Sequence, residues 1–246
     1  MHGNMSEWCH IYIESNPDEK EIKEAILRGG CWESKPEDCR SASRSHQSKH
    51  WGIYYDSGLR CVLSSDTEIT LSKIETSALP NKKTESAVQK KSNPNAGKRK
   101  VINVNGVEFA FRYCPPGTFK MGLPKDEDGA EMLCIQDKRD YINKIEKQHE
   151  VTLTKGFWIM ETEVTVGMYK AFIDETGYKP DKKKRAVGIN GYKTELDAKY
   201  SWLNPGFIQN ENFPVTCVTW HSATAFCEWL SKKTGLKIQL PTEAQW

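Results

Sequence analysis

The sequence predicts an α+β fold in which short strands and a few helices are joined by much irregular loop. Residues 213–246 read as a strand, a helix and a second strand, because a stripe of helical period lies between two short apolar segments. Asn105-Gly106 lies between two alternating runs, and this dipeptide is a strong hairpin signal. The 17 glycines and 11 prolines among 246 residues indicate many turns.

The helix near the C-terminus has signals at both ends. Thr219 is a good N-cap, because its hydroxyl can accept a hydrogen bond from a backbone N–H that has no partner within the helix. Lys232 and Lys233 fall in the last turn, where the helix carbonyls favour cations. Gly235 follows as a left-handed stop, with Leu236 placed to cover the end. The predicted buried stripe consists of Ala223, Phe226, Cys227 and Leu230.

A short strand and the start of another helix follow. Ile238 and Leu240 alternate as in a strand. Thr242 and Gln245 have the spacing of a capping box, which opens a helix. The sequence ends about one turn later, and an isolated helix this short is not stable. We therefore expect this end to be a cut through a domain.

Residues 101–178 alternate between strands and one helix. The run 101–114 forms the hairpin, followed by short strands that end at Met121 and begin near Val151 and Phe157. Thr165 is the predicted N-cap of a helix that stops at Gly177. The inward side chains predicted for this helix are Met168, Tyr169, Phe172 and Ile173.

Three segments are predicted to be irregular. Residues 64–100 are polar and contain no aromatic residue, so we expect a flexible linker that stays solvated, including its basic end at 98–100. Residues 124–147 are highly charged and read as a surface loop. Residues 179–212 read as a long loop held by Trp202 and Phe207, and long loops often carry function.

The composition excludes several function classes. No apolar run approaches 18 residues, so we expect no membrane span. The N-terminus lacks a basic region followed by an apolar one, although a chain cut at its front would have lost such a leader, so the compartment stays unknown. Residues 64–100 hold eight Lys/Arg and four Asp/Glu, a surplus of +4. The total of +2 leaves −2 for the rest, which argues against nucleic-acid binding.

Several motifs follow one another in an order typical of one family. In the C-terminal part they are PPGTFKMG (Pro115–Gly122), HEVTL (His149–Leu153), ETEVTVGMYKAF (Glu161–Phe172), TGY (Thr176–Tyr178), PVTCVTW (Pro214–Trp220) and LPTEAQW (Leu240–Trp246). In the N-terminal part they are GNMSEWC (Gly3–Cys9), RGGCW (Arg28–Trp32), RSASR (Arg40–Arg44) and GLR (Gly58–Arg60). Both sets resemble the formylglycine-generating enzyme domain family, also called the sulfatase-modifying factor family. The resemblance implies an incomplete C-type-lectin-like fold within the α+β class.

The order of the two sets implies an unusual domain organisation. Residues 1–63 resemble the C-terminal part of such a domain, and 101–246 resemble the N-terminal part of another, with 64–100 as the linker. A piece of a tandem-domain protein is the explanation we favour, and a circular permutant lacking its middle and a truncated product are the alternatives. We expect 1–63 to pack against 101–246, as the tail and head of one domain do.

The resemblance also implies a catalytic cysteine pair, four and nine residues past the second glycine of the RGG strand. Counting from Gly30, this chain has Ser34 and Cys39. Two close thiolates suit copper(I), which can pass electrons to dioxygen, whereas a hydroxyl is a poor copper(I) ligand and forms no disulfide. Cys39 is therefore the candidate catalytic residue, and copper is expected only if a complete cysteine pair exists outside this chain.

Simpler interpretations of the cysteines stay open. Cys31 is expected to point to the other face of the strand from Trp32, so it is not an obvious substitute for Ser34. Cys31, Cys39 and Cys61 are otherwise expected to be buried or to include one disulfide. The two cysteines at 217 and 227 read as small buried apolar residues.

A structural calcium ion is the second implied site. Asn4 and Glu7 lie three residues apart in GNMSEWC, and oxygen ligands of this kind suit Ca²⁺. The resemblance implies that backbone carbonyls complete the shell, and the alternative is that Glu7 only caps a turn. His149 reads as a surface or sheet-edge residue, since it has no ligand spacing with carboxylates.

Two functions follow as hypotheses. The first is an enzyme that oxidises a protein cysteine to formylglycine. The second is a catalytically inactive binding module that keeps the fold and has lost the chemistry, which Ser34 favours for the N-terminal part. Both imply a protein or peptide as the substrate or ligand.

Overall fold

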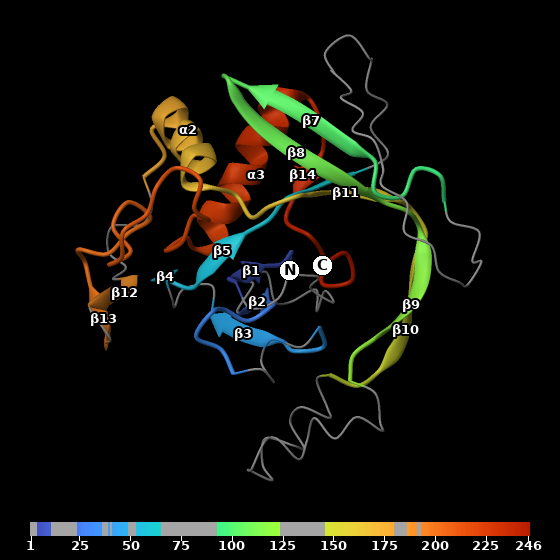
Figure 1. The fold of residues 1–246 in the computed structure, drawn as a ribbon, viewed down its shortest axis with the longest axis horizontal. Helices are drawn as coiled ribbons and strands as arrows, with labels where there is room; N and C mark the ends of the chain where they lie inside the picture. Colours follow the sequence, from blue (N-terminus) through green and yellow to red (C-terminus); the bar gives the residue numbers. More distant parts are fainter. Residues whose placement is uncertain are drawn as a thin grey trace, which may run out of the picture.

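The computed structural model describes residues 4–10, 24–35, 39, 41–48, 53–64, 93–123, 146–179, 186–190 and 193–246. Its fold is α+β and rich in sheet (Figure 1). The strands before residue 65 are β1 (Ser6–Trp8), β2 (Glu24–Arg28), β3 (Ser45–Ser48), β4 (Ile53–Tyr54), β5 (Ser57–Leu59) and β6 (Val62–Ser64). The later strands are β7 (Arg99–Val104), β8 (Val107–Cys114), β9 (Gly117–Met121), β10 (His149–Leu153), β11 (Phe157–Met160), β12 (Ala186–Asn190), β13 (Lys193–Asp197) and β14 (Ile238–Gln239). The helices within the described residues are α2 (Val166–Thr176) and α3 (Trp220–Thr234).

The largest sheet joins the two parts of the chain. Its strand order is β14-β6-β11-β8-β7, so β6 lies between two strands that come from the C-terminal part. Leu63 is paired with Ile238 on one side and with Trp158 on the other, and all these pairings are antiparallel. The prediction that residues 1–63 pack against 101–246 is therefore confirmed.

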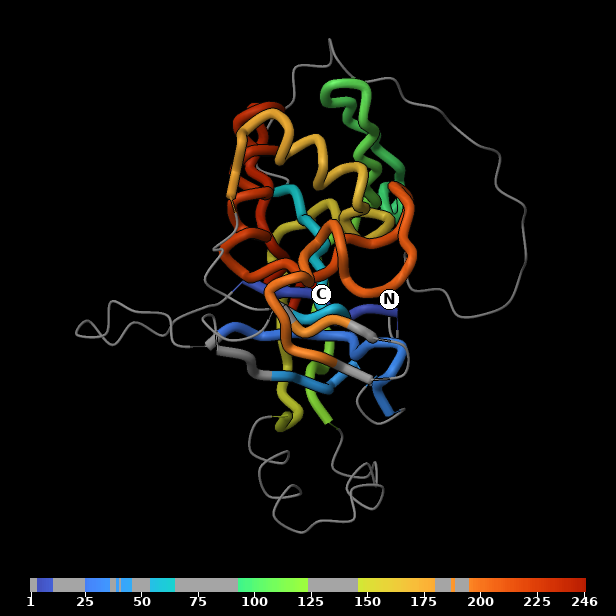
Figure 2. The backbone as a smooth tube through the Cα atoms, turned by 90° about the vertical axis from the view of Figure 1, so that its left-hand side faces the viewer, coloured from blue at the N-terminus to red at the C-terminus, as the bar shows by residue number. Residues whose placement is uncertain are grey.

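The remaining sheets are smaller. The N-terminal part forms a four-stranded sheet in the order β3-β2-β1-β5, in which β1 and β5 are parallel. A three-stranded sheet, β13-β12-β4, again joins the two parts of the chain. Strands β9 and β10 form a separate pair. In Figure 2 the helices lie in the upper half and the N-terminal strands, coloured blue, lie in the lower half.

Both helices begin and end where their local sequence predicts. Thr165 and Thr219 accept hydrogen bonds from backbone N–H groups in the first turns of α2 and α3. Gly177 and Gly235 end them in the left-handed conformation, which glycine adopts without strain. The hairpin β7–β8 turns at Asn105-Gly106, where both residues have positive φ as its turn type requires.

The main core lies between the helices and the large sheet. Both helices contact the hairpin β7–β8 (Figure 1). The ring centroid of Phe109 on β8 is 6.4 Å from those of Phe226 and Trp229 on α3, and Phe172 on α2 joins the same group. Trp8 and Leu63 from the N-terminal part are buried in this core too. Burial of these large side chains supplies the main stabilisation of the fold.

Two predictions about irregular segments are wrong in part. Arg99 and Lys100 do not form a solvated tail, because β7 begins at Arg99. The Arg99 guanidinium pairs with Glu161, and the Lys100 Nζ lies 4.2 Å from the Trp158 ring centre. The segment 179–212 contains the hairpin β12–β13, because β4, more than a hundred residues earlier, supplies a partner strand. Residues 65–92 and 124–145, predicted as linker and loop, lie outside the described residues.

Candidate functional site

A sharp turn after β2 creates the first candidate site. β2 ends at Arg28, and Gly29 and Gly30 follow with φ of 96° and 62°. Side chains with a Cβ rarely adopt this left-handed backbone, which explains the need for two glycines here. The turn directs residues 31–34 back toward the start of β5.

The Cys31 thiol and the Ser34 hydroxyl meet in this turn. The Cys31 Sγ lies 3.3 Å from the Ser34 Oγ, and the Cys31 backbone N–H donates to the same oxygen over 2.9 Å. The Cys39 thiol donates to the Cys31 carbonyl oxygen over 3.9 Å. The structure thus brings all three residues that the sequence singled out here into one turn, and it places the Cys31 thiol beside the hydroxyl at position 34.

A carboxyl group completes this cluster. Asp56 follows β4 and hydrogen-bonds both the Cys31 thiol and the Ser57 hydroxyl. Burial raises the pKa of Asp56, and these two hydrogen bonds counter that shift. Burial also raises the pKa of the Cys31 thiol, which is 5 % exposed, while the Ser34 hydrogen bond lowers it. The resting Cys31 is therefore a protonated thiol held between a hydroxyl and a carboxyl group.

A polar hollow of about 290 Å³ lies beside the turn. Serine hydroxyls dominate its wall, together with one carboxyl and one guanidinium group. Such a surface favours a ligand with many hydrogen-bonding groups, such as a peptide backbone. The polar residues in this wall include Ser6, Ser34, Ser43, Arg44, Asp56 and Ser57.

Two contacts in this cluster were not predicted from the sequence. Cys31 was not expected to reach position 34, because an extended strand would direct it away, but the chain turns at Gly30 instead of continuing the strand. Asp56 carried no signal, because it lies 25 positions after Cys31 and only the fold brings them together.

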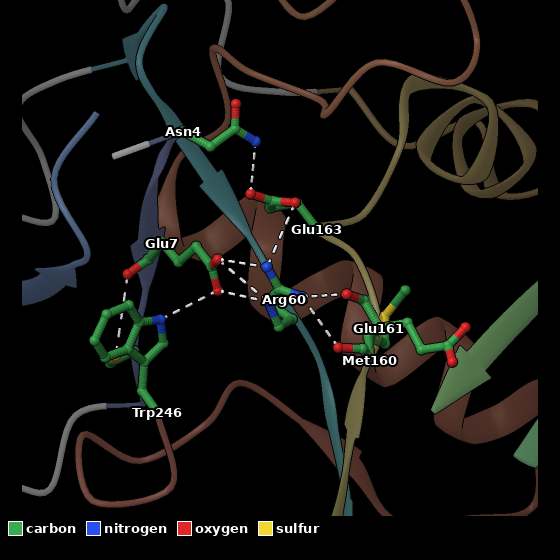
Figure 3. Close-up of polar contacts among 8 residues, drawn as sticks. Asn4, Glu7, Arg60, Met160, Glu161, Glu163 and Trp246 are labelled. Carbon is green, nitrogen blue, oxygen red and sulfur yellow. Dashed lines mark hydrogen bonds and ion pairs between the residues drawn. The ribbon is translucent and has the colours of Figure 1, made fainter. Parts of the chain in front are cut away.

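A second polar cluster surrounds Arg60, which lies between β5 and β6 (Figure 3). The Arg60 side chain is 3 % exposed, and that of Glu7 is fully buried. Arg60 donates from Nε and Nη2 to the Glu7 carboxylate over 2.9–3.2 Å, and from Nη1 to the carbonyl oxygens of Met160 and Glu161. Glu163 lies 3.4 Å from Nη2. The guanidinium therefore joins β1 to the segment after β11.

The predicted calcium residues belong to this cluster. The Trp246 ring N–H donates to Glu7, so this carboxylate accepts from two side chains. Burial raises the pKa of Glu7, and Arg60 counters that shift. The Asn4 amide nitrogen donates to Glu163 over 2.8 Å (Figure 3). Asn4 and Glu7 are thus near each other in the cluster but are engaged with different partners.

As placed, this donor set does not fit a calcium ion. The cation beside the Glu7 carboxylate is Arg60, and Ca²⁺ requires six to eight oxygen ligands. Within the described residues, no group of three or more His, Cys, Asp or Glu side chains is arranged to hold a metal. Calcium stays a prediction from the resemblance.

The other cysteines are mostly buried. The seven cysteines in the described ranges are all free thiols. Of the two alternatives for Cys31, Cys39 and Cys61, the disulfide therefore does not occur there, and Cys31 and Cys61 are buried as the other alternative predicts. Cys61 on the N-terminal part lies 3.5 Å, Sγ to Sγ, from Cys227 on α3. Cys217 is buried as predicted, although it lies outside any strand, and burial raises its pKa to about 12.

Comparisons with known proteins give one family match. The model of the sulfatase-modifying factor enzyme 1-like domain matches residues 1–65 and 110–246. No curated protein matches the chain. A solved structure titled "Structure of PvdO from Pseudomonas aeruginosa" is similar at 30% identity, covering 51% of this chain and 41% of that chain with a TM-score of 0.36. This chain therefore spans less than half of that protein, and so low a TM-score supports no inference about shape.

Helices of the length and apolarity required to cross a membrane do not occur in the described part of the chain.

Proposed function

Because this chain belongs to the sulfatase-modifying factor enzyme 1-like domain family, we propose that it acts on a protein or peptide cysteine and oxidises it to formylglycine. The observation that carries the proposal is the convergence of Cys31, Ser34 and Cys39 at one turn beside a polar hollow. Thiols are the groups that such chemistry needs at its centre, and the hollow offers hydrogen bonds to a peptide.

The copper that the resemblance implies fits only part of this turn. Ser34 and Cys39 offer one hydroxyl and one thiol, and a hydroxyl is a poor ligand for copper(I). The soft donors present are Cys31 and Cys39, and these would hold the ion if it binds here. Bound copper would supply electron transfer to dioxygen.

The remaining residues of the site would position the peptide and the proton of Cys31. Asp56 hydrogen-bonds the thiol and is the group placed to accept that proton. Ser34 holds the same thiol from the other side. The serine hydroxyls of the hollow would bind the peptide backbone, which orients a substrate cysteine toward the turn.

The test is aerobic conversion of a cysteine peptide by the full chain with copper(I) and a thiol reductant added. The reductant supplies two electrons, because conversion of the cysteine to an aldehyde and sulfide gives two of the four electrons that reduce dioxygen to water. Aldehyde product is captured with a hydrazide probe and identified by mass spectrometry. We expect Cys39→Ser to abolish the product and Cys31→Ser to lower it strongly. Ser34→Cys should raise it, because a second thiol beside that of Cys39 gives copper(I) a pair of soft ligands. Cys114→Ser, a half-buried thiol on β8, is the matched control. Absence of product from the unmodified chain and from Ser34→Cys would remove this proposal.

A catalytically inactive binding module is the second candidate. Ser34 and the protonated, buried state of Cys31 favour it, because neither residue offers a ready thiolate. In that case the same peptide binds without conversion, and its affinity is unchanged by Cys39→Ser. Binding measured by isothermal titration beside the aldehyde assay separates the two candidates.

The finer details of the architecture are proposals as well. We propose that the α+β fold is of the C-type-lectin-like kind that the resemblance implies. We also propose that residues 1–63 and 101–246 derive from the tail and the head of such domains, with 64–100 between them. Shared strand pairing between the two parts supports this division.

A further inference from the structure

Two thiols from different parts of the chain meet in the main core, away from the cysteine turn. Cys61 lies between β5 and β6 of the N-terminal part, and Cys227 lies in the middle of α3. Their Sγ atoms are 3.5 Å apart, although 166 positions separate the two residues in the sequence. The exposed fractions of Cys61 and Cys227 are 0 % and 2 %. The fold therefore holds two thiols in contact where solvent is excluded.

Regular elements fix the backbone on both sides of this contact. The Cys61 carbonyl oxygen accepts a hydrogen bond from the Met160 N–H over 3.0 Å, which ties this residue to β11. Cys227 belongs to the buried side of α3, a helix of 15 residues that is capped at both ends. A disulfide has an S–S distance of about 2.05 Å, so the two sulfur atoms need to approach by about 1.5 Å. A movement of this size is within the reach of side-chain rotation.

We propose that Cys61 and Cys227 form a disulfide that joins the two parts of the chain covalently. The thiols are free in the structure, which shows the reduced pair. The oxidant is a small disulfide of the class of oxidised glutathione. The disulfide is a modification of the core and takes no part in the proposed conversion of a peptide cysteine.

The reaction proceeds by two exchange steps. One protein thiolate attacks the small disulfide and releases one thiol, which leaves a mixed disulfide on the protein. The second protein thiolate then attacks the protein sulfur of that mixed disulfide and releases the other small thiol. Two protein thiols thus lose two electrons and two protons, and one small disulfide is reduced to two thiols.

Burial determines when this reaction can occur. The hydrogen bond with Cys61 and burial raise the pKa of Cys227 well above its ordinary value, so the folded chain presents no thiolate there at pH 7. A small disulfide also has no access to the two sulfur atoms while the core is closed. The exchange therefore takes place during folding, before β6 docks between β11 and β14. Once the core has closed, the same burial protects the disulfide from reductants.

The test refolds the full chain from urea in two buffers, one rich in oxidised glutathione and one with reduced glutathione only. Free thiols are blocked with N-ethylmaleimide in urea, and the digested protein is mapped by mass spectrometry without reduction. The oxidised sample should contain a peptide pair that joins Cys61 to Cys227, and the reduced sample should contain none. Because the bond closes a loop of 166 positions, thermal unfolding of the oxidised protein should occur roughly 5–15 °C higher.

Variants assign the effect to this pair. Cys61→Ala and Cys227→Ala should each remove the joined peptides and the difference in midpoint between the two buffers. Each variant also leaves a cavity, which lowers the midpoint by the same amount in both buffers. The difference between buffers is therefore the readout, because two thiols that only pack in the core would not produce it. Cys114→Ser, at a half-buried thiol on β8, is the matched control and should keep both the joined peptides and the difference.

Two results would overturn the proposal. One is complete labelling of both cysteines by N-ethylmaleimide in the oxidised sample. The other is a disulfide from Cys61 to a cysteine other than Cys227. If an alanine variant does not fold, the peptide map of the unmodified chain decides. These measurements use neither copper nor a peptide substrate, so the disulfide and the proposed function can fail separately.

Discussion

Arg28 and Arg60 are buried to the same extent but are compensated very differently. Both side chains are 3 % exposed, and both come from motifs of the N-terminal part. Arg60 bonds a buried carboxylate directly and gives its remaining donors to two carbonyls (Figure 3). Within the described residues, Arg28 donates to two carbonyl oxygens and its guanidinium carbon lies 5.6 Å from the Trp246 ring centre, while the Glu243 carboxylate, 3.9 Å away, accepts two hydrogen bonds from Arg44.

This difference separates two kinds of buried cation: Arg60 joins two strands through a directly bonded carboxylate, and Arg28 is held mainly by carbonyl oxygens and an aromatic ring. A buried charge is stable when an opposite charge and hydrogen bonds surround it, as around Arg60. Arg28 has a carboxylate at 3.9 Å, beyond hydrogen-bond distance, and its direct contacts are carbonyl oxygens and the Trp246 ring. Burial alone therefore does not show which arginine holds the fold together. The hydrogen-bond and charge partners of each arginine show it.

Arg60→Met should have the largest effect. It leaves the Glu7 carboxylate buried without a counter-ion, and loss of one partner of such a pair costs about 3–5 kcal/mol. The free energy of unfolding in urea measures this loss.

The double variant Glu7→Gln with Arg60→Met provides the control. It removes the orphaned charge, so it should recover part of the stability lost in Arg60→Met. If the single variant costs no more than about 1 kcal/mol, then Arg60 is no cross-link and the comparison with Arg28 fails.

Arg28→Met should cost less, about 1–3 kcal/mol. It leaves two buried carbonyls without a donor, but no carboxylate loses its main partner, because Arg44 still holds Glu243. Urea unfolding measures this loss as well. A loss as large as that of Arg60→Met would mean that Arg28 is structural in the same sense.

The exposed pair between Lys233 and Glu175 extends the comparison to a charged pair that faces solvent. The Lys233 hydrogen bond lowers the pKa of Glu175 below its ordinary value of 4.5. Because the pKa is lowered in the folded state, the pair gives stability that is fully present above the unfolded-state pKa. This stability is lost as the pH falls through the folded-state pKa. The free energy of unfolding of Glu175→Gln should therefore be slightly lower than that of the unmodified chain at pH 7 and equal to it at about pH 2. Urea unfolding at both pH values measures the difference, which should be small because the pair faces solvent.

Calcium should have the smallest effect of all. With Arg60 beside Glu7, added Ca²⁺ should leave the thermal midpoint of the unmodified chain unchanged, and so should a chelator. A calcium-dependent rise that disappears in Glu7→Gln would instead support the implied metal site and would displace Arg60 from its role.

Local chemistry made much of the fold predictable. The caps Thr165 and Thr219 and the stops Gly177 and Gly235 act within one turn of the chain, so nearby sequence is enough to place them. The hairpin at Asn105-Gly106 is equally local. The ordered motifs also predicted the family, and the residues that the family model matches include these motifs.

The sites were harder to predict because they depend on contacts between distant segments. Asp56 reaches Cys31 only after β4 and β5 are placed, and the partners of Arg60 come from positions 7 and 160–163. Strand β12 was missed because its alternation is broken at Gly188, which packs against the Tyr200 ring. No local sequence pattern indicates such pairings between distant segments.

The place of β6 in the large sheet has a further consequence. This strand, Val62–Ser64, is hydrogen-bonded on both edges by β11 and β14, and Leu63 is part of the main core. The two parts of the chain therefore need no peptide bond between them to recognise each other. Residues 1–64 and 93–246, produced as separate polypeptides, should reassemble as the halves of a split protein.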